Sequence, residues 1–205
     1  DEGVNTSNWS FFPNGADRDF INLKLGTNER NSKVKMIFYA GNIGSGQGLE
    51  TIIPKLAKIL EADYRFVIVG DGSTLNLLRE SIKRDNINNV ELLPPVQRIK
   101  LVEYYKDADI LFLHLNDFPA FKRVLPSKLF EYAALGKPIV AGLSGYPAEF
   151  LKTNLSYSFV FNPGNVHSAI ACVSEASSCI PAQKTINNFV KLYSREVIMK
   201  KLCKK

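Results

Sequence analysis

The residues most suited to chemistry lie where predicted strands end in glycine-rich turns. The first turn runs from residue 41 to 48, opens directly into a predicted helix, and contains Gly41, Asn42, Gly44, Gln47 and Gly48. Glycines let a backbone approach a ligand, and a helix N-terminus offers unpaired N–H groups and a partial positive charge to phosphate. The spacing departs from the dinucleotide-binding fingerprint, so the turn alone fits a phosphate site or a tight strand-to-helix turn equally well.

A second turn, Gly70-Asp71-Gly72, ends the next predicted strand. In open α/β folds this carboxyl edge of the sheet is where ligands bind. Asp71 also suits a plain turn former or helix N-cap. It is the one acid near the position where a dinucleotide-binding fold holds its ribose, so a dehydrogenase or nucleotide-sugar epimerase remains a weaker alternative.

The segment from residue 118 to 141 is the most informative. Pro126 and Ser127 form a natural helix start, and the N–H groups of Ser127 and Lys128 would then point out of the sheet edge as an anion site. Glu131 follows one turn later on the same side, where its carboxylate would accept two hydrogen bonds from a ribose diol. A capping box explains Glu131 poorly, because the spacing from Ser127 is one residue too long.

The elements that position these residues alternate in type from residue 33 onward. Strands are predicted at 34–40, 65–69, 90–93, 110–114, 138–141 and 157–161, and helices at 48–60, 74–84, 99–106, 127–135, 147–152, 166–175 and 186–202. Runs such as 66–69 and 110–113 are apolar on both faces, as in parallel strands covered by helices on each side. The sequence therefore predicts a doubly wound, Rossmann-like parallel α/β sheet.

Composition limits the class of protein. The chain has 205 residues, of which 45% are hydrophobic, enough for one buried core. Residues 1–32 are rich in Asn, Gly, Ser and Asp, which predicts a connector with at most one short strand at 9–12. A net charge of +6 suits a phosphorylated ligand or an anionic membrane surface, whereas nucleic acid is disfavoured because dense basic runs with interleaved aromatics are missing.

Cysteines and targeting signals add little. Cys172, Cys179 and Cys203 are odd in number and form no C-x-x-C pair, so neither zinc nor a disulfide framework is indicated, and a reducing compartment is expected. His114 and His167 have no metal-ligand spacing and are predicted to be structural. No apolar run approaches the roughly 20 residues of a membrane span, and no signal peptide is recognisable. Because the chain begins with Asp, we expect a fragment.

Taken together, four ordered motifs resemble the C-terminal domain of GT-B glycosyltransferases of family 4, especially the bacterial branch that builds capsules, O-antigens and exopolysaccharides. The motifs lie at 40–50, 67–72, 108–110 and 126–138, and the Pro-Asn-Gly-Ala-Asp run at 13–17 is similar to the family's interdomain connector. The resemblance implies the C-terminal half of a GT-B fold. Residues 1–32 would form the end of the missing N-terminal domain and the connector between the two domains. Residues 33–205 would form the domain that binds the nucleotide-sugar donor.

The resemblance also implies an activity: retaining hexosyl transfer from a nucleotide-diphosphate sugar, most commonly a UDP-sugar, with no obligatory metal or other cofactor. A lipid-linked or glycan acceptor would be held by the missing N-terminal domain, so the fragment alone is expected to be inactive. We expect a cytoplasmic protein at the inner face of the plasma membrane, with peripheral membrane association. A noncatalytic binding module is the remaining alternative.

The same resemblance assigns nucleotide binding to Gly41, Asn42, Gly44, Gln47, Gly48, Gly70, Asp71, Gly72, Val96, Arg123, Pro126, Ser127, Lys128 and Glu131. Glu131 would be the second acid of the family's Glu-x7-Glu pattern and would bind the ribose hydroxyls. Arg123 stands where the first acid is expected. Many members carry basic residues at the positions of Asn42 and Gln47. We therefore expect Arg123, helped by Lys128, to take over phosphate binding, with an exposed loop cation as the alternative for Arg123.

Overall fold

The computed structural model describes residues 12–23 and 33–203, which build a six-stranded sheet. Its strands are β1 (Lys35–Asn42), β2 (Tyr64–Asp71), β3 (Val90–Leu93), β4 (Ile110–His114), β5 (Ile139–Gly142) and β6 (Ser158–Phe161). They lie in the order β3-β2-β1-β4-β5-β6, and every neighbouring pair is parallel. This is the Rossmann order, with a change of winding direction between β1 and β4, and it confirms the predicted fold class.

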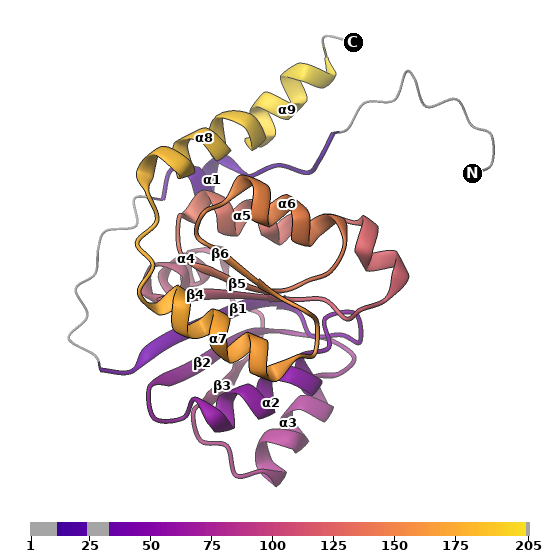
Figure 1. Ribbon diagram of the computed structural model, residues 1–205, viewed down its shortest axis with the longest axis vertical. Helices are drawn as coiled ribbons and strands as arrows, with labels where there is room; N and C mark the ends of the chain where they lie inside the picture. Colours follow the sequence, from indigo (N-terminus) through magenta and orange to yellow (C-terminus); the bar gives the residue numbers. More distant parts are fainter. Residues whose placement is uncertain (1–11, 24–32, 204–205) are drawn as a thin grey trace.

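Helices cover both faces of the sheet (Figure 1). The helices of the described residues are α1 (Arg18–Ile21), α2 (Leu49–Ile59), α3 (Leu75–Arg84), α4 (Arg98–Asp107), α5 (Ser127–Leu135), α6 (Tyr146–Asn154), α7 (Val166–Ser177), α8 (Gln183–Tyr193) and α9 (Arg195–Leu202), with a 3-10 turn η1 (Pro119–Arg123). Helix α8 packs on α5 and on α9, outside the helix layer that covers the sheet. The predicted bounds of β3, β4 and α5 agree with the structure. The 3-10 turn was not predicted and lies in the expected loop after β4.

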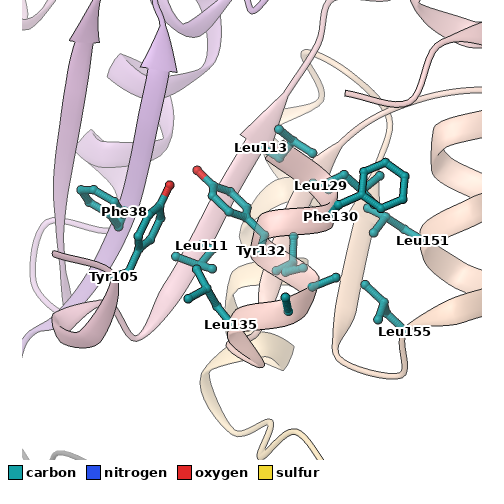
Figure 2. Packing of buried hydrophobic residues seen from close by; sticks show 14 of the residues in the cluster. Phe38, Tyr105, Leu111, Leu113, Leu129, Phe130, Tyr132, Leu135, Leu151 and Leu155 are labelled. Atoms are coloured by element: carbon teal, nitrogen blue, oxygen red, sulfur yellow. The ribbon is translucent and has the colours of Figure 1, made fainter. Parts of the chain in front are cut away.

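Two apolar cores follow from the alternation of side chains along the strands. Met36 and Phe38 of β1 face the core under α4, α5 and α6, whereas Ile37 and Tyr39 face the core under α2, α3 and α7. Figure 2 shows the first core, where Phe38 lies beside Tyr105 of α4 and Tyr132 comes from α5. The central strands are therefore buried on both sides, as the continuous apolar runs predicted.

The single helix predicted at 186–202 is wrong, because the chain forms two helices that meet at Ser194. Ser194 has an extended backbone, with φ −67° and ψ 142°. The N–H of Ala16 donates to the Tyr193 oxygen at 2.8 Å, and the N–H of Arg195 donates to the Ala16 oxygen at 2.8 Å. Ala16, which is distant in sequence, thus binds the Tyr193 carbonyl and the Arg195 N–H, two backbone groups that a continuous helix would have paired internally.

Residues 12–23 pack onto this domain. Ala16 and Phe20 are buried in the first core, and Phe20 makes an edge-to-face contact with Tyr105 at 5.8 Å between ring centroids. Helix α1 within this segment was not predicted. Of the short strand expected at 9–12, residues 9–11 lie outside the described residues, and Phe12 is not in a strand. A domain boundary at residue 33 stays a prediction.

Candidate functional site

A cavity of about 360 Å³ opens at the carboxyl ends of β1 and β2, beside α5. The strand order reverses next to it, between β1 and β4, and such switch points are where open α/β sheets form ligand sites. The cavity is lined by Ala40, Gly41, Asn42, Val69, Gly70, Asp71, Pro95, Val96, Leu101, Tyr105, Lys128 and Glu131.

The cavity brings together about half of the residues selected from the sequence: Gly41, Asn42, Gly70, Asp71, Val96, Lys128 and Glu131. The others lie outside its lining, and they are Gly44, Gln47, Gly48, Gly72, Arg123, Pro126 and Ser127. The three motifs that contribute are far apart in sequence, and the parallel sheet places them at one edge because parallel strands end on the same side.

Lys128 and Glu131 lie one turn apart on α5 and face the same cavity. Burial lowers the pKa of the Lys128 ammonium, and the Glu131 carboxylate opposes this shift. Burial raises the pKa of Glu131, and Lys128 is the strongest of the cations that oppose it. The cavity wall therefore carries one cation and one carboxylate that are both partly withdrawn from water, and each would gain from a polar ligand.

Two glycines let the strand ends approach each other and α5. Gly70 has φ +156°, and a Cβ there would overlap the carbonyl oxygen of Gly41. A Cβ on Gly41, which has φ +147°, would overlap Nζ of Lys128. At Gly70 the close approach of the neighbouring backbone excludes a side chain, and at both positions the positive φ favours glycine. That these glycines let the backbone approach a ligand stays a prediction.

Asp71 takes the structural role that the sequence allowed for it. Its Oδ1 accepts a hydrogen bond from the N–H of Gly72 at 2.7 Å, which fixes the turn after β2. The side chain is exposed and also borders the cavity. Asp71 can therefore both stabilise the turn and remain available at the cavity edge.

The glycine-rich loop, residues 43–48, acts on the cavity through Asn42. Gln47 does not line the cavity, but its Oε1 accepts hydrogen bonds from Asn42 Nδ2 at 2.7 Å and from the Gly44 N–H at 3.3 Å. Asn42, which does line it, is therefore held in place by Gln47. Gly48, in the left-handed conformation at φ 58°, immediately precedes α2.

The start of α5 is as predicted, with Pro126 in the N-cap position and Ser127 as the first helical residue. No side chain caps this helix. Of the three α5 residues selected from the sequence, Lys128 and Glu131 line the cavity. Ser127 is exposed and lies outside the lining. Arg123 lies on η1 with an exposed side chain, outside the cavity lining.

Sequence reasoning missed the apolar wall formed by Pro95, Leu101 and Tyr105. The Pro94-Pro95 pair directly after β3 could have indicated part of this wall, because it ends a parallel strand at the carboxyl edge of the sheet, where the cavity lies. Tyr105 packs edge-on against Tyr132 at 5.9 Å between centroids, and Figure 2 shows their hydroxyl groups converging from α4 and α5. Burial raises the pKa of Tyr105, so its hydroxyl stays protonated at neutral pH.

A Rossmann-ordered sheet with a charged cavity at its switch point defines a doubly wound α/β domain with a candidate ligand site at the carboxyl edge of the sheet. The chain belongs to the glycosyl transferases group 1 family, whose profile matches residues 22–191. It is 27% identical over 197 residues to the putative colanic acid biosynthesis glycosyl transferase WcaI of Escherichia coli K12, covering 91% of this chain and 48% of that protein. It is 24% identical to the 2-deoxystreptamine N-acetyl-D-glucosaminyltransferase of Niallia circulans, covering 82% and 41%.

Solved glycosyltransferases share the fold. The lipopolysaccharide outer core galactosyltransferase WaaB, in its apo form, superposes with a TM-score of 0.70 at 16% identity, over 97% of this chain and 55% of that one. Anabaena HepE in complex with UDP and glucose superposes with a TM-score of 0.66 at 17% identity, over 84% and 48%. These likenesses confirm the expected half of a GT-B fold. The chain spans about half the length of the curated relatives that it matches.

No helix in the described part of the chain combines the length and the apolar character needed to cross a bilayer.

Proposed function

We propose that this chain is the donor-binding half of a retaining hexosyltransferase and that it binds the nucleotide diphosphate of a UDP-sugar in the cavity beside α5. The observation that carries the proposal is the joint presentation of Lys128 and Glu131, from one face of α5, to a cavity at the switch point of the sheet. Cation and carboxylate match the two polar parts of a nucleotide diphosphate, which are phosphate and ribose.

Each part of the cavity wall has a role in this proposal. Glu131 accepts hydrogen bonds from the ribose hydroxyls. The Lys128 ammonium meets the diphosphate. The uncapped start of α5, which directly precedes Lys128 and lies outside the cavity lining, favours the anion through its partial positive charge. The apolar side formed by Pro95, Val96 and Leu101 takes the base.

The biological setting is proposed from the relatives. WcaI is described as a putative colanic acid biosynthesis enzyme. We assign this chain to bacterial surface polysaccharide biosynthesis, with a lipid-linked or glycan acceptor. The acceptor would be bound outside these 205 residues, because the chain covers about half of its relatives. A cytoplasmic location at the inner face of the plasma membrane follows from such an acceptor.

Isothermal titration calorimetry of the 205-residue chain tests the donor site. UDP, GDP, ADP, uridine and NADH are titrated separately, with and without EDTA. We expect UDP to bind more tightly than the other ligands, and EDTA to leave its affinity unchanged. Tighter binding of NADH would favour a dehydrogenase or epimerase, and the absence of saturable nucleotide binding would reject the donor site.

A further inference from the structure

His114 ends β4 inside the protein, with both ring nitrogens engaged. Its Nδ1 lies 2.6 Å from the backbone oxygen of Gln47, and its Nε2 lies 3.1 Å from the backbone nitrogen of Gly164. The Gly164 N–H is a donor, so Nε2 accepts, and the ring proton is on Nδ1, which donates to Gln47. The neutral imidazole thus joins the glycine-rich loop to the loop between β6 and α7.

The surroundings of His114 are apolar. Its ring stacks on Phe112 and Phe161, with centroid distances of 6.3 and 5.9 Å, and the residue is fully buried. A Cβ on Gly142 of β5 would overlap the His114 ring, so the neighbouring strand leaves room for it. Burial also lowers the pKa of the imidazole, which keeps it neutral. A phenylalanine would fill this place without hydrogen bonds, and the polar ring therefore has a specific task.

That task concerns the carbonyl groups of the glycine-rich loop. Three consecutive carbonyls of this loop are held by the end of β4 and the residues after it. Ser45 O accepts from Asn116 Nδ2 at 2.5 Å, Gly46 O accepts from the Asn116 N–H at 2.9 Å, and Gln47 O accepts from His114. Strand β4, which neighbours β1, and the residues that follow it thus fix the backbone of the glycine-rich loop.

The connection continues from the loop to the cavity. Gln47 uses its backbone oxygen for His114 and its side-chain oxygen for Asn42, and Asn42 lines the cavity. A shift of the Gln47 backbone would therefore move the amide that orients Asn42. His114 itself does not line the cavity.

We propose that His114 is a positioning residue for the nucleotide site, which acts by holding Gln47 and through it Asn42 at the cavity wall. This inference rests on the proposed donor site, because it concerns how that site is ordered.

Three substitutions separate the two hydrogen bonds of the ring. His114→Asn places an amide donor near Nδ1 and keeps the bond to Gln47. His114→Gln reaches the place of Nε2 and keeps the bond to Gly164. His114→Phe keeps the ring volume and loses both bonds. His167→Gln, a change of an exposed histidine on α7, is the matched control.

UDP affinity, measured by calorimetry on variants shown to be folded by circular dichroism, is the first readout. We expect His114→Asn and His167→Gln to stay within about twofold of the parent, and His114→Gln and His114→Phe to lose about threefold to tenfold, the range of one hydrogen bond. Equal affinities for the Asn and Gln variants, or losses that only follow melting temperature, would overturn the proposal.

The second readout needs no nucleotide. In NMR spectra, His114→Gln should shift the side-chain amide signals of Asn42 and Gln47 more than His114→Asn does. Unshifted signals in His114→Gln would refute the positioning role even if UDP binds. If the expected shifts occur but the parent protein binds no UDP, His114 still orders Gln47 and Asn42 at the cavity wall, and the proposed donor site fails.

Discussion

The ammonium group of Lys128 lies 5.5 Å from the ring centroid of Tyr39, at the wall of the cavity. The Tyr39 hydroxyl donates to the backbone oxygen of Asn42 at 2.6 Å, so the aromatic ring under the lysine also supports the end of β1. A cation over an aromatic face is favourable but replaces only part of the lost hydration. Lys128 is therefore a desolvated charge that a phosphate would stabilise.

Removing this charge should weaken binding of the diphosphate selectively. We expect Lys128→Met to cost UDP about tenfold or more, the range of a hydrogen bond to a charged group, and to change uridine affinity little. Arg123→Ala should also affect UDP more than uridine, but less than Lys128→Met, because Arg123 lies outside the cavity lining. Calorimetry with both ligands decides. Equal losses of UDP and uridine affinity would argue against phosphate contact by either residue.

Glu131→Ala should weaken UDP and uridine alike, since both carry the ribose. The expected loss is about 1.5–3 kcal/mol of binding free energy, as for hydrogen bonds to a charged group. Glu149→Ala, a change of an exposed acid on α6, is the matched control. If the Glu131 variant binds UDP with parental affinity, Glu131 is a helix-surface acid without a ligand.

The lowered pKa of Lys128 has a defined pH signature. Its folded-state pKa lies below its unfolded value, so the unfolded chain binds more protons, and stability rises as alkaline pH passes from the folded to the unfolded pKa. Lys128→Met should abolish this rise. Denaturant unfolding of both proteins from neutral to alkaline pH gives the comparison, and parallel curves would refute the shift. Bound UDP should raise the Lys128 pKa, so UDP affinity should fall as pH rises through the bound-state value.

The attachment of residues 12–23 should depend on apolar burial and not on surface charge. Phe20→Ala removes a buried ring from the first core and should cost about 3–5 kcal/mol of the free energy of unfolding. Arg18→Ala removes the exposed ion pair with Glu196, which is 2.6 Å long, and should leave stability nearly unchanged. Urea denaturation of both variants is the measurement, and similar costs would contradict this assignment.

Sugar transfer should fail in the 205-residue chain alone, although it folds and binds nucleotide. Holding an acceptor against the donor sugar lowers the activation barrier by as much as about 7–11 kcal/mol, and we place that function outside this chain. The assay incubates the chain with labelled UDP-sugars and bacterial membrane lipids. Efficient product formation would show that these residues contain an acceptor site.

The sequence by itself determined the order of strands and helices. Apolar runs and helical periodicity are local properties, and they gave the bounds of β3, β4 and α5 as the structure has them. They also placed the glycine turns and Glu131 at the carboxyl edge, because parallel strands must all end on one side. The family motifs predicted which of those residues belong to a nucleotide site.

Only the tertiary structure decided which residues meet across that edge. The break at Ser194 depends on Ala16, and the cavity wall depends on Tyr105 of α4, neither of which any local pattern can indicate. Likewise, His114 looked structural in sequence, and its bond to Gln47 exists because β4 pairs with β1. Such contacts join residues distant in the chain, and they depend on how the elements pack together rather than on any local pattern.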